Sequence, residues 1–75
     1  NNIGPGYIKT NMTKNSFNNK VMKKIITKHT ILDKWGSSID VAKGCLFLSS
    51  EMSDYITGQD LYIDGGWLAK GVINF

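Results

Sequence analysis

The chain has 75 residues, of which 41% are hydrophobic and 20% are charged, and its formal net charge is +3. A polypeptide of this length forms one small domain, which buries only roughly 60% of its unfolded surface and is marginally stable alone. No apolar run approaches the ~20 residues that cross a bilayer, and one cysteine, Cys45, excludes a disulfide framework or a cysteine-based metal site within this stretch. We therefore expect a soluble, cytoplasmic protein, with Cys45 as a small buried side chain on a helix.

Positive charge is concentrated in the first 28 residues, which hold six lysines and no acidic residue. All six acidic residues lie between Asp33 and Asp64. Such a cluster can attract phosphate, either from a cofactor or from a nucleic acid. Arginine, the usual side chain for bidentate phosphate contacts, is absent from the sequence. We expect a solvated helix face, and neither a nucleic acid nor a membrane as a partner.

Ile3-Gly4-Pro5-Gly6 predicts the end of a strand followed by a turn. Proline fixes φ and lacks a backbone donor, and the glycine after it tolerates positive φ and lets a ligand approach the main chain. The segment is not a dinucleotide fingerprint, because the third glycine is missing. A chain reversal is the expected role, and a ligand contact is the alternative.

Residues 14 to 29 carry the pattern of an amphipathic helix. Ring or apolar side chains recur every four residues, at Phe17, Val21, Ile25 and His29, and lysines occupy many of the other positions. The asparagine-rich start is a poor helix former, and a loosely held helix after a glycine turn suits a lid over a site. We expect His29 to cap the helix or face solvent, with an acid–base role as the alternative.

A second helix is predicted after Trp35-Gly36, from Ser37 to about Ser49. Ser37 and Asp40 match the Ser-x-x-Asp capping box, in which the serine oxygen accepts the Asp40 amide and the carboxylate reaches back. This is the best-defined helix in the sequence. Its wide apolar face comprises Val41, Ala42, Cys45, Leu46 and Leu48.

One strand is predicted at Leu61–Ile63, bounded by Thr57-Gly58 and Asp64-Gly65-Gly66. Leu61 and Ile63 point to one face and Tyr62 to the other. A lone strand leaves backbone groups unpaired, so it should dock on strands that this chain largely does not provide. Because the sequence also opens inside a motif, we expect residues 1–75 to be one carboxy-terminal segment of a longer domain.

Side chains that carry chemistry are few. The sequence shows no Ser/His/Asp set with recognisable spacing, no His/Cys cluster and no paired carboxylates on one helical face. We therefore assign no catalytic residue and no metal ligand. The residues alone indicate a ligand-binding edge and an assembly surface, which would also cover the apolar side chains of the tail, residues 68–75.

Several motifs in register resemble the short-chain dehydrogenase/reductase family. The first twelve residues are similar to the family's Asn-x-Ile-x-Pro-Gly-x-x-x-Thr segment, and the likeness extends to about residue 67. The further matches follow in the family's order and spacing: Leu32-Asp33-Lys34-Trp35-Gly36, Asp40-Val41-Ala42, Phe47-Leu48-Ser49-Ser50, Tyr55-Ile56-Thr57-Gly58-Gln59 and Asp64-Gly65-Gly66.

The resemblance implies an α/β fold, namely the carboxy-terminal part of a Rossmann-like doubly wound parallel sheet. This part would comprise the substrate-loop helix, one long helix and the last strand. The strand before Pro5 would lie beside the strand at Leu61–Ile63. The Ser38–Ser49 helix and the Leu61–Ile63 strand would pair with a neighbouring subunit in a homodimer or homotetramer. Contacts there would include Gly58, Gln59 and Trp67.

The resemblance also implies NAD or NADP as the cofactor. Pro5 and Gly6 would line the nicotinamide, and the Ile8 backbone would meet its carboxamide. The Thr10 hydroxyl would bond to the carboxamide or the diphosphate. Residues 11 to 30 would form the substrate loop and lid, with Met12 facing the substrate.

The implied activity is hydride transfer between NAD(P) and a hydroxyl or ketone substrate. The ending at residues 64–69 resembles members that act on sugar acids such as gluconate or 2-deoxygluconate, and a 3-oxoacyl carrier-protein reductase is the alternative. The family's glycine-rich phosphate turn, catalytic serine and Tyr-x-x-x-Lys pair match nothing in this stretch, so the chain alone should be inactive. A second hypothesis is a non-catalytic truncated product that at most associates with intact subunits.

Overall fold

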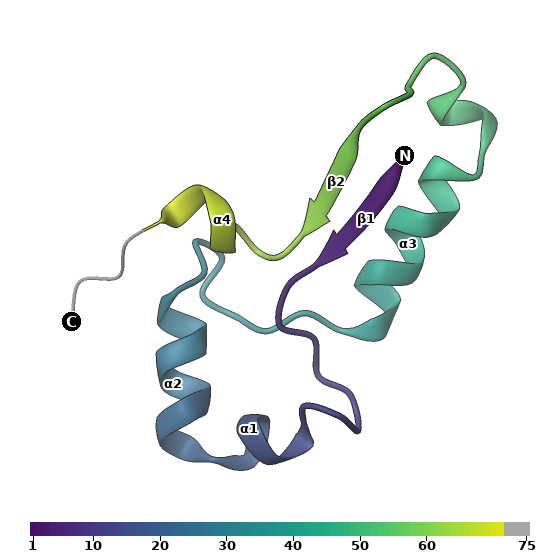
Figure 1. The fold of residues 1–75 in the computed structure, drawn as a ribbon. Helices are drawn as coiled ribbons and strands as arrows, with labels where there is room; N and C mark the ends of the chain where they lie inside the picture. The colour runs from purple at the N-terminus through teal and green to yellow at the C-terminus, as the bar shows by residue number, and fades with distance from the viewer. Residues whose placement is uncertain (72–75) are drawn as a thin grey trace.

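A computed structural model describes residues 1–71; residues 72–75, the last part of the apolar tail, lie outside the described residues (Figure 1). The elements in chain order are β1 (Asn2–Pro5), α1 (Lys14–Asn18), α2 (Lys20–Lys28), α3 (Ser38–Leu48), the 3-10 turn η1 (Glu51–Ser53), β2 (Asp60–Ile63) and α4 (Trp67–Lys70). The two strands lie side by side with α3 along them, whereas α1 and α2 lie beyond the strand ends, on the side where α4 begins. Among residues 1–71, no helix combines the length and the hydropathy needed to cross a membrane.

β1 and β2 form a parallel pair in which Ile3 lies opposite Leu61 and Pro5 opposite Ile63. The neighbouring position of these two strands, which the family resemblance implied, is confirmed. The expectation from the residues alone, that β2 must dock on strands from elsewhere, was wrong for this edge. The Asn1 side chain fixes the register, since its Nδ2 donates to the Ile56 carbonyl at 3.1 Å and its Oδ1 accepts from the Gln59 amide at 2.9 Å. Both strands therefore end at the same edge of the sheet.

α3 begins with the predicted capping box. The Ser37 Oγ accepts from the Asp40 amide at 3.3 Å, and the Asp40 Oδ2 accepts from the Ser37 amide at 2.8 Å. The helix approaches the sheet at Gly44, where a Cβ would overlap the Cδ1 methyl of Ile63. A residue without a side chain is therefore required for α3 to lie this close to β2.

The predicted burial of the wide α3 face was wrong on one side. Cys45 is exposed, and Ile39 and Leu46 are 65% and 71% exposed. Two strands are too narrow to cover the whole apolar face of a helix, so only the stripe toward the sheet, including Val41, is half-buried. The other apolar residues form an outer face.

The predicted helix at residues 14–29 is two helices, separated at Asn19. This residue has extended backbone (φ −82°, ψ 113°), and its Oδ1 accepts from the amides of Val21 and Met22, both at 3.1 Å. An asparagine side chain competes with the helical backbone for donors, which ends α1 and caps α2. Ile26 is the buried residue of α2, at 3% exposure. His29 is the C-cap of α2, as predicted.

Candidate functional site

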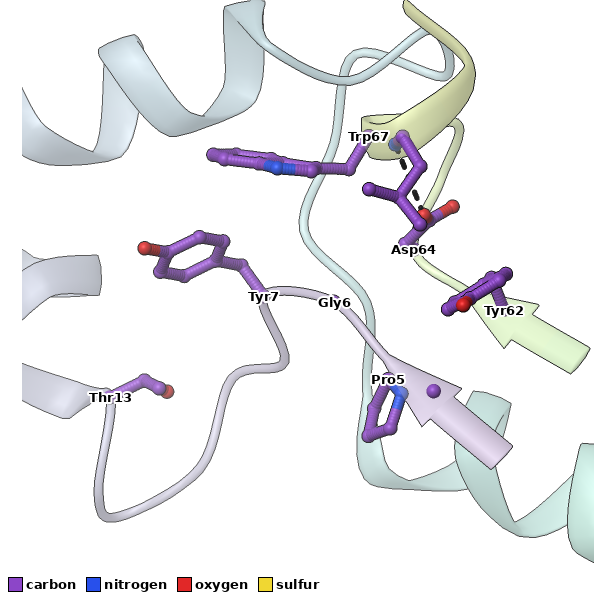
Figure 2. Close-up of a pocket in the computed structure, with 9 residues that line it drawn as sticks. Pro5, Gly6, Tyr7, Thr13, Tyr62, Asp64 and Trp67 are labelled. Atoms are coloured by element: carbon purple, nitrogen blue, oxygen red, sulfur yellow. Dashed lines mark hydrogen bonds between the residues drawn. The ribbon is translucent and has the colours of Figure 1, made fainter. Parts of the chain in front are cut away.

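A pocket of about 480 Å³ lies where the two strands end. In open α/β sheets, ligands bind outside the carboxyl ends of parallel strands, so this position is the expected one for a site. Figure 2 shows side chains from the ends of β1 and β2, from the loop after β1 and from α4 around this space. The lining residues are Gly4, Pro5, Gly6, Tyr7, Thr13, Tyr62, Asp64, Trp67 and Leu68.

Gly6 holds the floor of the pocket together. Its amide donates to the Ile63 carbonyl at 3.0 Å, which extends the strand pairing by one bond. A Cβ at Gly6 would lie 2.7 Å from the Cβ and 2.8 Å from the Cα of Asp64. Backbone cannot give way as a flexible side chain can, so only glycine keeps the loop after β1 against the end of β2.

Asp64 fixes the start of α4 at the rim of the pocket. Its Oδ1 accepts from the Gly66 amide at 2.9 Å, and its Oδ2 accepts from the Leu68 amide at 3.2 Å (Figure 2). Gly65 and Gly66 have φ of +62° and +93°, conformations that favour glycine. The Asp-Gly-Gly motif therefore turns the chain sharply, and both carboxylate oxygens are bonded to the turn.

The loop after β1 is tied to the segment before α3 at Ile8. The Gly36 amide donates to the Tyr7 carbonyl at 3.1 Å, and the Lys9 amide donates to the Gly36 carbonyl at 3.0 Å. In such a parallel bridge, the amide and carbonyl of the central residue, Ile8, point away from the partner strand. The Ile8 carbonyl accepts from the Thr13 Oγ1 at 2.5 Å. The Ile8 amide is therefore directed away from Gly36.

The structure brings some of the predicted site residues together and leaves others apart. Pro5 and Gly6 line the pocket. Ile8 is buried at 9% exposure, and Thr10 is an exposed residue of the loop. Met12, at 96% exposure, projects into solvent and is not part of the pocket lining.

A row of aromatic rings, which the sequence analysis did not predict, joins the pocket to α1 and α2. The ring centroids of Tyr7 and Trp67 are 4.9 Å apart, and those of Tyr7 and Trp35 are 5.5 Å apart. Trp35 in turn meets Phe17 of α1 edge-on at 5.3 Å, and Trp67 stacks on His29 at 3.8 Å. The signal available in the sequence was the two tryptophans, because each large ring needs a partner to pack against.

The Asp40 carboxyl has a pKa below its ordinary value. The largest cause is the hydrogen bond from the Ser37 amide, followed by the bond from the Ser37 hydroxyl; burial opposes the shift, and Lys34 and Lys43 reinforce it. The lowered pKa of Asp40 reflects its role in the cap of α3, because Asp40 is not among the residues that line this pocket.

A known protein family matches nearly the whole chain. A family model described as enoyl-(acyl carrier protein) reductase matches residues 1–68. The chain belongs to the short-chain dehydrogenase/reductase family. The motifs at Asn1–Thr10 and Asp64-Gly65-Gly66 are therefore those of a short-chain dehydrogenase/reductase, as their resemblance implied.

Two curated relatives of the short-chain dehydrogenase/reductase family are close in sequence. The chain is 39% identical over 70 residues to a 2-dehydro-3-deoxy-D-gluconate 5-dehydrogenase of Bacillus subtilis, covering 93% of this chain and 28% of the relative. It is 42% identical over 64 residues to a 3-oxoacyl-[acyl-carrier-protein] reductase of Buchnera aphidicola, and the match covers 85% of this chain and 25% of that relative. The chain thus spans about a quarter of the length of these relatives.

Solved structures of short-chain dehydrogenases/reductases have the same fold in this region. A protein of Agrobacterium tumefaciens, provisionally assigned as a 2-deoxy-D-gluconate 3-dehydrogenase and crystallised with bound NADP, is 43% identical and superposes with a TM-score of 0.84 over 89% of this chain and 27% of that one. Such neighbours have Rossmann folds, and they carry bound NADP or NADH. The α/β structure with its parallel strands is a segment of that fold, as predicted.

Proposed function

We propose that residues 1–75 are the carboxy-terminal segment of a Rossmann domain whose full-length parent transfers hydride between NAD(P) and a hydroxyl or ketone substrate. The observation that supports this most strongly is the pocket at the shared carboxyl edge of β1 and β2, which begins at the family's own Pro5-Gly6 turn. The match over residues 1–68 supports the same conclusion. NAD(P) supplies or accepts the hydride, and the chain's residues hold and enclose it.

In this proposal, the loop after β1 holds the nicotinamide end of the cofactor. Gly6 lets the loop lie directly against Asp64 at the floor of the pocket, and Pro5 lines the pocket beside it. The Ile8 amide, directed away from Gly36, would donate to the carboxamide. Thr10 would offer its hydroxyl to the carboxamide or the diphosphate. The residues present thus fit a planar, amide-bearing ring at this edge of the sheet.

α1 and α2 would form the lid over the substrate. They are attached to the pocket wall through Phe17 and His29, whose rings pack on Trp35 and Trp67. Met12, fully exposed before α1, would turn toward the substrate when the lid closes and excludes water. The lysines of the lid would raise the local concentration of an anionic substrate.

Sugar acids are the substrate class that we favour, because the gluconate-type relatives are similar over nearly the whole chain. A 3-oxoacyl carrier-protein reductase is the second candidate, favoured by a relative with 42% identity. Both substrate classes carry negative charge. The single cysteine is consistent with our placement of the protein in the cytoplasm.

The outer face of α3 and the free edge of β2 would form a subunit interface in a homodimer or homotetramer. Ile39 and Leu46 are exposed apolar residues on that face. β2 pairs on one side only, with β1, within residues 1–71. An apolar helix face beside an open strand edge is a surface that a second subunit could cover, with Gly58, Gln59 and Trp67 among its contacts.

Steady-state kinetics of the full-length protein test the proposal. Purified protein should oxidise NADH or NADPH in the presence of a keto-sugar acid. The same assay with 3-oxoacyl thioesters tests the second candidate. Turnover of neither substrate class with either cofactor would contradict the assignment, as would the absence of a Tyr-x-x-x-Lys pair in the upstream sequence. The 75-residue chain alone should show no turnover, which separates the parent's activity from that of a truncated product.

A further inference from the structure

Thr13 stands at the N-cap of α1, but its hydroxyl does not cap the helix. Threonine at this position ordinarily accepts from an amide in the first turn and stabilises the helix. The Thr13 hydroxyl is bonded instead to the loop after β1. A side chain that does not make its usual local bond is often recruited for a site.

The Thr13 Oγ1 joins the two loop residues that the proposed function assigns to the cofactor. It accepts from the Thr10 amide at 2.9 Å and donates to the Ile8 carbonyl at 2.5 Å. The Thr10 hydroxyl lies 3.4 Å away. Thr13 also lines the pocket, and Figure 2 shows its side chain on the side of the pocket opposite α4.

We propose that Thr13 is a positioning residue that sets the orientation of the Ile8 peptide and of Thr10 for the nicotinamide, and that couples this loop to the lid through α1. This inference rests on the proposed function. The hydroxyl bonds to the Ile8 carbonyl, and the Lys9 amide of the same peptide donates to the Gly36 carbonyl. This peptide is therefore held from both sides, so the segment that carries the Ile8 amide keeps one path. The Thr13 carbonyl accepts the Phe17 amide at 2.9 Å, so one residue joins the loop to the first turn of α1.

The physical consequence is a link between lid position and cofactor contact. If α1 moves away, the Thr13 hydroxyl leaves Ile8 and Thr10 together, because both bonds end on one oxygen atom. The loop then loses the orientation that favours the carboxamide. Thr13 itself need not touch the reacting atoms.

The test uses the full-length protein and three variants. Thr13→Val keeps the shape of the side chain and removes the hydroxyl, whereas Thr13→Ser keeps the hydroxyl. Thr57→Val is the matched control, because Thr57 is an exposed residue outside α1, α2 and the lining of this pocket. Dissociation constants are measured for NAD(P)H and for ADP-ribose, or its 2′-phosphate, which lacks the nicotinamide.

Thr13→Val should raise the dissociation constant for NAD(P)H about tenfold, which is the usual effect of losing ordinary hydrogen bonds. ADP-ribose should bind as it does to the unmodified protein, and Thr13→Ser and Thr57→Val should bind both ligands normally. Three results would overturn the role of Thr13. In Thr13→Val, the binding of both ligands could weaken equally, or NAD(P)H binding could stay unchanged. In Thr13→Ser, NAD(P)H binding could fail to return to normal.

Amide hydrogen exchange separates this inference from the proposed function. The Thr10 amide, which donates to the Thr13 Oγ1, should exchange faster in Thr13→Val and normally in Thr13→Ser. If the unmodified protein bound no NAD(P)H, the proposed function and the cofactor role of Thr13 would both be wrong. If it bound NAD(P)H and Thr13→Val bound it equally well, the Thr13 role alone would be wrong.

Discussion

The two halves of the molecule are held together by different kinds of contact. In the sheet with α3, backbone hydrogen bonds, a capping box and a helix–strand approach at Gly44 fix the geometry. Around α1 and α2, short helices are joined to the pocket by the rings of Trp35 and Trp67 and by one threonine hydroxyl. We expect the first kind of contact to give a rigid frame and the second to give an attachment that depends on a few side chains. The proposed lid over the cofactor edge would require such an attachment.

The largest expected effect comes from removing a ring at the centre of the lid attachment. Trp67→Ala should lower the free energy of unfolding of the full-length protein by about 3 kcal/mol, the low end for such a change because the ring is half-buried. Amide exchange should quicken in α2 much more than in α3. Trp67→Phe keeps a ring between Tyr7 and His29 and is the control. Equal exchange in α2 with and without the ring would contradict the proposed attachment.

A substitution where α3 packs on β2 should destabilise the fold by overpacking. Gly44→Ala places a methyl group against the Cδ1 of Ile63 and should cost about 2 kcal/mol in thermal or denaturant unfolding. Adding Ile63→Val removes that Cδ1 atom, so the double variant should be more stable than the sum of the single changes predicts. Strict additivity of the two changes would show that α3 does not lie against β2 at this point.

The cap of α3 should give a smaller and pH-dependent effect. Ser37→Ala should cost about 1 kcal/mol at pH 7 in urea denaturation. Because hydrogen bonds from Ser37 hold the Asp40 pKa below its ordinary value, the carboxylate favours the folded state at neutral pH. That contribution is lost as the pH falls below about 4 and through the lowered pKa.

The capping prediction is checked by comparing unfolding at pH 7 and pH 3. The deficit of Ser37→Ala relative to the unmodified protein should shrink as the pH falls from 7 to 3. The variant keeps the amide bond to Asp40 but lacks the hydroxyl bond, and that hydroxyl bond favours the ionised carboxylate. Ser38→Ala, at the neighbouring exposed position, should show no such change. A deficit that is the same at both pH values would refute the linkage.

The smallest effect is expected at the outer end of the aromatic row. The Lys23 Nζ lies 4.1 Å from the centroid of Phe17. Lys23→Met keeps the length of the side chain and removes the charge, so it should loosen α1 by only about 0.5 kcal/mol. Local amide exchange in α1 is the measurement, with Lys14→Met as the control. Loosening that is as large as in Trp67→Ala would mean that charge, rather than ring packing, holds the lid.

Prediction from sequence succeeded where short-range rules decide the structure. The Pro-Gly turn, the capping box at Ser37 and the glycine-bounded strand all depend on neighbours within a few residues. The helix break was missed because the side chain of Asn19 competes with backbone carbonyls for amide donors. The spacing of apolar residues does not change at such a cap. The exposure of Cys45 was missed because the apolar face of a helix does not indicate how wide the sheet that covers it is.

The site was predictable only in part for the same reason. Pro5 and Gly6 lie in a local motif, and their position at the pocket follows from the strand that precedes them. Trp67 and His29 are far apart in sequence, and their stacking depends on the path of the whole chain. Side-chain contacts of this long range leave no spacing pattern for sequence analysis to read.

Amide hydrogen exchange at the loop after β1, with and without NAD(P)H, tests the central claim most directly. In the full-length protein, the cofactor should slow exchange at Gly6 and Ile8 and, more weakly, in α1 and α2, while α3 should not change. Slower exchange confined to parts of the protein outside residues 6–28, with the Ile8 amide unaffected, would contradict the claim that this edge of the sheet holds the nicotinamide.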